Sequence, residues 1–424
     1  MFYIFGAGVS GIAAARYLLS IKNESDNVCL IDSQKTYSDV AEELGRSDFT
    51  LLKDIDPDSI SKKDIFIPSP GISPESEIYK KFTAKKCNVI GEVELSLGDF
   101  GGKIIAITGT NGKSTTTEIC TYLCKNIKHS AVSSGNIGLP PSQVIVNGNN
   151  EEYMALELSS YQLEIINTKF ADAAIFTNFT PDHLERHKTL EAYFEAKWKL
   201  VTTGLKDGAP FICTDSVVSM AKKLGKALPA NTINISEQKQ NDIVFSLISN
   251  GDHNKQNARL AIEAVSLICS ATQEELKEAV KLFPGLEHRC EIVKETPQIT
   301  IVNDSKSTNV ESTLTALKSF KGPITLILGG EAKKESFAPI ANFNNISQVL
   351  IYGKDKEKIY EELGDTVPRV VAPTLEDVLN IYLAKYQDKT KTLLFSPGCA
   401  SFDQFSNFEM RGQQFKHLVK KLIP

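Results

Sequence analysis

The sequence predicts an α/β protein of three domains, in which helices cover mainly parallel sheets. Short apolar runs alternate with amphipathic stretches along almost all of the 424 residues, and this is the pattern of parallel strands joined by helices. The length exceeds the roughly 100–200 residues of one domain. The composition is that of a globular protein, because 42% of the residues are hydrophobic and 23% are charged.

The strands are predicted where a short apolar run ends in glycine or a polar residue, and ligands of open α/β sheets bind at those carboxyl ends. Helices are predicted to reach Lys125, over Leu190–Leu200 and over Gln273–Phe283, and the polar stretch Ser236–Asp252 reads as short strands and turns. The predicted strands are Phe2–Phe5, Val28–Ile31, Ile65–Ile67, Ile104–Ile107, Met154–Leu158, Ala173–Thr177, Ile299–Val302, Ile324–Leu328, Val349–Tyr352 and Thr392–Phe395.

Two domain boundaries are predicted, one near Gly91 and one near Pro284-Gly285. The second pair of residues stops helices and directly follows a helical stretch. The expected domains are therefore residues 1–91, 92–285 and 286–424.

Several classes of protein are disfavoured. A net charge of -5 argues against a general nucleic-acid binder, which needs a concentrated basic face. The eight cysteines contain no CxxC pair, so we expect buried, reduced thiols and a cytoplasmic protein. Residues 1–15 are mostly apolar but no basic region precedes them, which favours a buried strand and helix over a signal peptide. No other stretch approaches the roughly 20 apolar residues of a membrane span.

A phosphate-binding loop follows the strand Ile104–Ile107. The segment Thr108-Gly-Thr-Asn-Gly-Lys-Ser-Thr115 leads into a helix, whose free N–H groups would face the phosphates. Lys113 would neutralise phosphate charge and the Ser114 hydroxyl would bind magnesium. The common motif has its first glycine where this chain has Ile107. The residues expected to contact ATP here are Gly109, Thr110, Asn111, Gly112, Lys113, Ser114 and Thr115.

Two further polar residues follow strands. Glu157 ends a strand, and a carboxylate there would complete a magnesium shell beside the loop. An isolated glutamate such as Glu157 would not by itself indicate a functional site, and an isolated histidine such as His183 is more often a packed or capping residue. Beside a phosphate loop both become candidates for the site.

The N-terminus carries a dinucleotide fingerprint. Gly6-Ala-Gly-Val-Ser-Gly11 follows a strand, and Asp32 closes the next one. Taken alone this pattern indicates a nicotinamide- or flavin-dependent oxidoreductase. Any ligand with a diphosphate and a ribose would also fit it.

Taken together, these motifs resemble the Mur ligase family, and most closely its members that add D-glutamate. The resemblance implies a Rossmann-like N-terminal domain for a UDP sugar, a central P-loop-type parallel-sheet ATPase domain, and a Rossmann-like C-terminal domain that closes over the site. The matching motifs are the loop at 109–115, Glu157-Leu-Ser-Ser-Tyr-Gln162, Asp182-His183, Ala196-Lys197, His253-Asn254 with Asn257, His288-Arg289, Asn303-Asp-Ser-Lys-Ser-Thr-Asn309 and Ser401-Phe-Asp-Gln-Phe405.

For the central site the resemblance implies two magnesium ions on Ser114, Glu157, His183 and Lys197, with Lys113 as a further catalytic residue. Lys197 would carry CO2 as a carbamate, because an ammonium cannot bind a metal and a carbamate supplies hard oxygen ligands. The alternative for Lys197 is an ordinary surface lysine, and the alternative for His183 is to orient water or substrate.

Adenine and ribose contacts are implied at Asn254, Asn257, Arg289 and Asp304. Helix capping by Asn254, a strand turn at Asp304 and a surface ion pair at Arg289 are the alternatives. D-Glutamate contacts are implied at Lys306, Thr308, Lys333 or its neighbour Lys334, Ser401, Phe402 and Phe408. UDP-sugar contacts are implied at Val9, Ser10, Asp32, Ser33, Ser69, Gly71, Asn136, Ser159 and Gln162. Ser10, Ser33, Glu185 and Phe402 are mild departures from the family pattern.

The implied activity is ATP-dependent addition of D-glutamate to UDP-MurNAc-L-Ala through an acyl phosphate and a tetrahedral intermediate, by a monomer. The alternatives are a Mur ligase with another amino acid, a folylpolyglutamate synthetase, a nicotinamide-dependent oxidoreductase and a nucleotide-sensing protein without catalysis. An oxidoreductase would leave Lys113, Glu157 and Lys197 unexplained.

Overall fold

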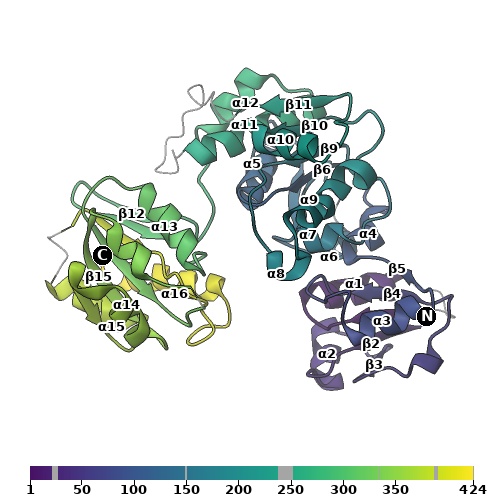
Figure 1. The fold of residues 1–424 in the computed structure, drawn as a ribbon, viewed down its shortest axis with the longest axis horizontal. Coiled ribbons are helices and arrows are strands. Elements are labelled where there is room, and N and C mark those ends of the chain that lie inside the picture. Colours follow the sequence, from purple (N-terminus) through teal and green to yellow (C-terminus); the bar gives the residue numbers. More distant parts are fainter. Residues whose placement is uncertain (22–26, 149, 237–251, 334, 386–389, 424) are drawn as a thin grey trace. The chain divides into compact units, whose positions relative to one another are not determined.

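The computed structural model of the chain describes residues 1–21, 27–148, 150–236, 252–333, 335–385 and 390–423 (Figure 1). The described residues form two compact units that divide between Phe283 and Pro284. The first unit contains two sheets and the second contains one. The predicted boundary near Gly91 falls inside the first unit, so the division into three domains stays a prediction. Residues 237–251, predicted as short strands and turns, lie outside the described residues.

The first sheet is parallel and has the strand order β3-β2-β1-β4-β5. Successive side chains of a strand point to opposite faces, so Ile4 packs with helices α1 and α2 on one face, whereas Tyr3 packs with α3 on the other. The elements are β1 (Phe2–Phe5), α1 (Val9–Ile21), β2 (Val28–Ile31), α2 (Tyr37–Leu44), β3 (Thr50–Leu52), the 3-10 helix η1 (Pro57–Ser59), β4 (Ile65–Pro68), α3 (Glu77–Ala84), β5 (Asn88–Val89) and α4 (Glu92–Leu97).

The second sheet is also parallel, in the order β11-β10-β9-β6-β8-β7. Strand β6 lies between β8 and β9, so the carboxyl ends of these three strands meet at one edge of the sheet. The elements are β6 (Lys103–Thr108), α5 (Lys113–Asn126), β7 (Ala131–Gly135), α6 (Pro141–Val146), β8 (Tyr153–Glu157), α7 (Ser160–Leu163), β9 (Ala173–Phe176), α8 (Leu184–His187), α9 (Leu190–Lys199), the π-helix η2 (Leu200–Gly204), β10 (Phe211–Thr214), α10 (Asp215–Lys223), β11 (Thr232–Ile235), α11 (Asp252–Cys269) and α12 (Gln273–Val280).

The two sheets of the first unit are joined through α4 and α6. The backbone N–H of Ser142 donates a hydrogen bond of 2.8 Å to the Glu92 carboxylate, and Arg16 on α1 donates to Gln143 on α6 at 2.7 Å. Glu92 is 4% exposed. Burial raises the pKa of Glu92 to about 7, while the hydrogen bonds from Ser142 oppose that rise.

We expect Glu92→Gln to stabilise the protein above pH 7. Below pH 4.5, the ordinary value for this group, the carboxyl is protonated in both states and costs nothing. Between pH 4.5 and 7 only the folded state holds the proton, so stability falls as pH rises, and the full penalty of about 3 kcal/mol is present above pH 7. Urea unfolding at pH 4.5 and pH 8 measures the difference. Glu77→Gln is the matched control, since Glu77 also begins a helix but is exposed; an equal gain in both variants would contradict the assignment.

The sheet of the second unit is mixed, in the order β12-β13-β17-β14-β15-β16. The other strands of this sheet are parallel, but β12, which was not predicted, runs antiparallel to β13. The connection between these strands is a tight turn in which Thr296 N–H donates to Ile299 O at 2.8 Å, and so short a connection joins only antiparallel strands. The elements are β12 (Glu291–Glu295), β13 (Thr300–Asn303), α13 (Val310–Lys318), β14 (Ile324–Gly329), the 3-10 helix η3 (Ala338–Asn342), β15 (Ile346–Tyr352), α14 (Lys356–Glu362), the 3-10 helix η4 (Gly364–Thr366), β16 (Arg369–Val371), α15 (Leu375–Lys385), β17 (Thr392–Phe395) and α16 (Phe408–Leu422).

Candidate active site

The loop between β6 and α5 leaves the N-terminus of α5 open. Gly112 precedes the helix and supplies no side-chain cap, so the first backbone N–H groups of the helix are available to an anion. The loop begins later than in the common motif, because Ile107 is still part of strand β6 and is fully buried. This explains why the chain does not need a glycine at position 107.

Glycine is required at two positions of this loop. The φ angles of Gly109 and Gly112 are +149° and +80°, which disfavour residues with a Cβ atom. A Cβ at position 109 would lie 1.9 Å from Thr177 Oγ1, and a Cβ at position 112 would lie 2.3 Å from Asn257 Oδ1. The loop therefore lies directly against β9 and α11.

Two lysines converge on one carbonyl of the loop. Lys113 Nζ donates to Gly109 O at 3.0 Å and to Thr110 O at 2.9 Å, while Lys197 Nζ, from α9, donates to Gly109 O at 2.7 Å. Lys197 is 1% exposed, and its ammonium lies 4.8 Å from the centre of the Tyr193 ring. Burial and the neighbouring Lys113 ammonium hold the pKa of Lys197 well below its ordinary value. Lys197 is thus not a surface lysine.

Glu157 lies at the end of β8, opposite Ile107 of β6 in the sheet register. Its Oε1 accepts a hydrogen bond of 2.8 Å from Asn136 Nδ2. Its Oε2 is buried and has no hydrogen-bond partner. A buried, unpaired carboxylate oxygen is rare, and it suits a hard cation such as magnesium.

His183 precedes α8 in a left-handed conformation, with φ of 51°. Its Nδ1 lies 3.1 Å from the Tyr161 hydroxyl, and its ring lies 6.0 Å from the ring of Tyr193, which also contacts Lys197. Among the described residues, no group of three or more His, Cys, Asp and Glu side chains is clustered for a metal. The set implied by the resemblance contains only two such residues, Glu157 and His183.

Three residues that the sequence did not single out shape this site. Asn178 Oδ1 accepts from Asn111 N–H at 2.9 Å, and the Thr177 hydroxyl donates to Asn111 O at 2.6 Å. The Tyr193 ring lies between the side chains of Lys197 and His183, because it contacts both the Lys197 ammonium and the His183 ring. Thr177 and Asn178 stand at the carboxyl end of a predicted strand, and Tyr193 precedes Lys197 by one helical turn. These positions in the sequence could have indicated that the three residues lie near the site.

The residues implied for adenine and ribose divide between the two units. Asn257 is 4% exposed and contacts the loop at Gly112. Asn254 lies in the first turn of α11, two residues after Asp252. Arg289 and Asp304 belong to the second unit. Burial raises the pKa of Asp304, against hydrogen bonds from Ser307 and Ser396 that lower it.

The residues implied for D-glutamate lie at the carboxyl ends of β13, β14 and β17. Lys306 Nζ is 5.1 Å from the centre of the Phe408 ring. Thr308 is half-buried, Ser401 is buried, and Phe402 and Lys333 are exposed; Lys334 lies outside the described residues. The fully buried Arg411 donates to Ser305 O and to Cys399 O, which joins the loops that carry Lys306 and Ser401.

The residues implied for the UDP sugar lie at the carboxyl ends of β1, β2 and β4, and in the second sheet near Glu157. Asp32 accepts hydrogen bonds from the backbone N–H groups of Ala7, Gln34 and Lys35, and these bonds lower its pKa against the effect of burial. Ser69 packs against Gly6, and Ser159 forms a capping box with Gln162. Val9, Ser33 and Gly71 are exposed and Ser10 is half-buried.

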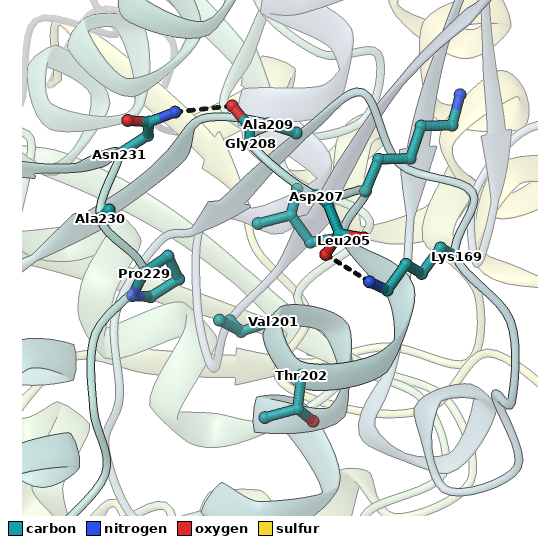
Figure 2. A pocket seen from close by; sticks show the side chains of 11 residues that line it. Lys169, Val201, Thr202, Leu205, Asp207, Gly208, Ala209, Pro229, Ala230 and Asn231 are labelled. Carbon is teal, nitrogen blue, oxygen red and sulfur yellow. Dashed lines mark hydrogen bonds and ion pairs between the residues drawn. The ribbon is translucent and has the colours of Figure 1, made fainter.

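A separate pocket of about 180 Å³ contains none of these residues. Figure 2 shows its wall, where Lys169 pairs with Asp207 and Asn231 donates to Gly208 O. Its lining precedes strands β9, β10 and β11 in the chain, so it lies at the edge of the sheet opposite the phosphate loop.

Comparison with known families gives two matches. The model of the Mur ligase middle domain matches residues 107–278, and the model described as the Mur ligase, glutamate ligase domain matches residues 288–399. Relatives match from end to end. A protein named UDP-N-acetylmuramoylalanine--D-glutamate ligase from Alkaliphilus metalliredigens is 31% identical, covering 99% of this chain and 97% of the relative.

The chain belongs to the Mur ligase family. A relative of the same name from Leptospira interrogans is 32% identical, covering 99% of this Mur ligase and 96% of the relative. Among solved structures, the UDP-N-acetylmuramate-alanine ligase MurC from Thermotoga maritima has a TM-score of 0.58 at 16% identity and covers 99% of both chains. MurF from the same organism, in complex with ADP, has a TM-score of 0.56 at 16% identity and covers 86% of this chain and 97% of its own. At such identities these structures show a shared fold. No helix in the part of the chain that the structure describes is long and apolar enough to cross a membrane.

Proposed function

We propose that this Mur ligase uses ATP to join the amino group of D-glutamate to the alanine carboxyl of UDP-MurNAc-L-Ala, in the cytoplasm, with release of ADP and phosphate. The observation that carries the ATP chemistry is the open N-terminus of α5, flanked by Lys113, Lys197 and the unpaired Glu157 oxygen. The acceptor is supported by the end-to-end similarity to relatives that bear the D-glutamate ligase name.

In the first step, the alanine carboxylate attacks the terminal phosphorus of ATP, and ADP leaves. The N–H groups at the start of α5 bind the phosphates, and Lys113 neutralises charge on the phosphoryl group as it moves. Magnesium, held by Ser114, Glu157, His183 and a carbamate on Lys197, would supply further neutralisation. The buried, unpaired Glu157 oxygen supports this assignment.

Carbamate formation requires a neutral amine. The amine lone pair of Lys197 attacks the carbon of CO2, and one proton is released as the carbamate forms. Because burial and Lys113 lower the pKa of Lys197, a larger fraction of this amine is neutral than in an exposed lysine. We therefore propose that Lys197 is carbamylated in the active enzyme.

In the second step, the D-glutamate amine attacks the acyl phosphate, and the tetrahedral intermediate expels phosphate. Cations suit the two carboxylates of the amino acid, so we propose that Lys306 binds one of them, beside Phe408 and the Ser401–Phe402 segment. The carboxyl edge of the first sheet, with Asp32 and Ser69, would bind the UDP group.

The decisive experiment measures phosphate release with ATP, UDP-MurNAc-L-Ala and a panel of amino acids. We expect release with D-glutamate and a background rate with L-glutamate, L-alanine, L-lysine and diaminopimelate. Release with another amino acid would show a Mur ligase of different specificity. ATP binding without release for any acceptor would instead support a sensing protein, and substrate-dependent NAD reduction would support an oxidoreductase.

A further inference from the structure

A pair of thiols lies at the far end of α5 from the phosphate loop. Cys124 is in the last turn of α5 and Cys269 ends α11, and their Sγ atoms are 3.6 Å apart. Each of the eight cysteines is free. The two helices pack in the same direction, because Asn257, in the second turn of α11, meets Gly112 at the start of α5. The thiol pair thus joins the C-terminal ends of a helix pair whose N-terminal ends shape the candidate ATP site.

The two sulfur atoms differ in access. Cys269 is 6% exposed and lines an open pocket of about 730 Å³, together with Lys128, His129 and Glu275. Cys124 is 1% exposed and is not part of the pocket wall. A small oxidant in the pocket would therefore reach Cys269 first.

The surroundings also make Cys269 the more acidic thiol. The hydrogen bond from Cys124 lowers the pKa of Cys269, as do a hydrogen bond from Tyr153 and the charge of Lys103, whereas burial and Glu152 raise it. Lys103 Nζ donates to Ile268 O at 3.2 Å, which holds the ammonium beside the thiol. The hydrogen bond between the two thiols has the opposite effect on Cys124, because it raises the pKa of that thiol. A nucleophilic thiol with a second thiol in contact is the arrangement of a redox-active pair.

We propose that Cys124 and Cys269 are a modification site at which a hydroperoxide closes a disulfide between α5 and α11. The Cys269 thiolate attacks the distal oxygen of ROOH, the O–O bond breaks, and an alcohol and a sulfenic acid form. The Cys124 sulfur then attacks the sulfenic sulfur and water leaves. In sum, two thiols and ROOH give one disulfide, ROH and H2O, and a dithiol reductant restores the thiols.

The geometry requires only a small movement. A disulfide bond is about 2.05 Å long, and the sulfur atoms are 3.6 Å apart, so the two sulfur atoms are already in contact before the bond forms. The cross-link would then hold together the two helices that carry the phosphate loop and Asn257.

The test treats the full-length protein with hydrogen peroxide and counts thiols after denaturation. We expect the count to fall from eight to six, because two of the eight are consumed, with a loss of about 2 Da in intact mass and a cross-linked peptide pair that contains Cys124 and Cys269. Treatment with dithiothreitol should restore eight thiols.

Two single variants separate the roles of the cysteines. Cys124→Ala should stop at a sulfenic acid on Cys269 that dimedone traps, and Cys269→Ala should leave Cys124 unreacted. Cys120→Ala is the matched control, since Cys120 is buried one turn earlier on the same helix, and it should form the disulfide normally. Eight thiols in the peroxide-treated wild-type protein, or a disulfide that survives Cys269→Ala, would overturn the proposal. These readouts do not depend on ligase activity, so they stand apart from the proposed function.

Discussion

Replacement of Lys113 by methionine is expected to lower kcat/KM for ATP by about 10²–10³-fold. Methionine keeps much of the length and apolar packing of lysine but removes the charge that we propose faces the phosphates, and the loss of one preorganised donor from a phosphoryl-transfer site has an effect of this size. Phosphate release in the presence of saturating D-glutamate and UDP-MurNAc-L-Ala measures it.

Lys125→Met is the matched control, because Lys125 lies in the last turn of the same helix and its side chain is exposed. It should retain wild-type kinetics. The unfolding temperatures of both variants need to match that of the wild type, so that a loss of activity reports on the site. If Lys113→Met retained full activity while still folded, Lys113 would have no role in the transfer.

The second large effect is expected for Lys197→Met, with a fall in kcat of about 10²-fold or more, because magnesium would lose an anionic ligand in the transition state. The wild-type protein in ¹³C-bicarbonate should show a carbamate carbon signal by NMR, and the variant should lack it. Since only the neutral amine reacts with CO2, the signal should grow as pH rises, and the lowered pKa of Lys197 places this growth at a lower pH than for an exposed lysine.

The control for this variant is Lys199→Met on the same helix. The Lys199 ammonium donates to the backbone carbonyl of Glu164 at 2.6 Å, away from the phosphate loop, so its removal should leave the carbamate signal intact. Full activity of Lys197→Met, unaffected by added bicarbonate, would exclude the carbamate. Lys113→Met adds a cross-check: loss of the neighbouring charge should raise the pKa of Lys197 and weaken the carbamate signal.

The strands at the centre of each sheet could be predicted because both of their faces are buried. Ile104–Ile107 is a continuous apolar run, Ile324–Leu328 is interrupted only by Thr325, and the structure confirms strands at both places. Edge strands such as Thr50–Leu52 and Arg369–Val371 were not predicted, since they are short and partly exposed. The buried strand Phe211–Thr214 was also missed. The helix predicted over Gln273–Phe283 ends at Val280, and the one over Leu190–Leu200 continues into a π-helix to Gly204.

The phosphate loop could be predicted because its glycines, lysine and following helix are contiguous in the chain. The surroundings of Lys197 could not be predicted from spacing. Its bond to Gly109 O joins residues 88 positions apart, and its burial depends on how α9 packs against the loop. For Glu157, the position at the end of a strand could be predicted. The pairing of its Oε1 with Asn136, 21 positions away, and the burial of its unpaired Oε2 could not.

The contact between Gly112 and Asn257 restricts which residues can replace Gly112. Position 112 is closed to other residues for two independent reasons, the positive φ angle and the Asn257 oxygen at 2.3 Å from the absent Cβ. A smaller residue at position 257 removes only the second obstacle. The positive φ angle remains, so position 112 stays restricted to glycine whichever residue occupies position 257.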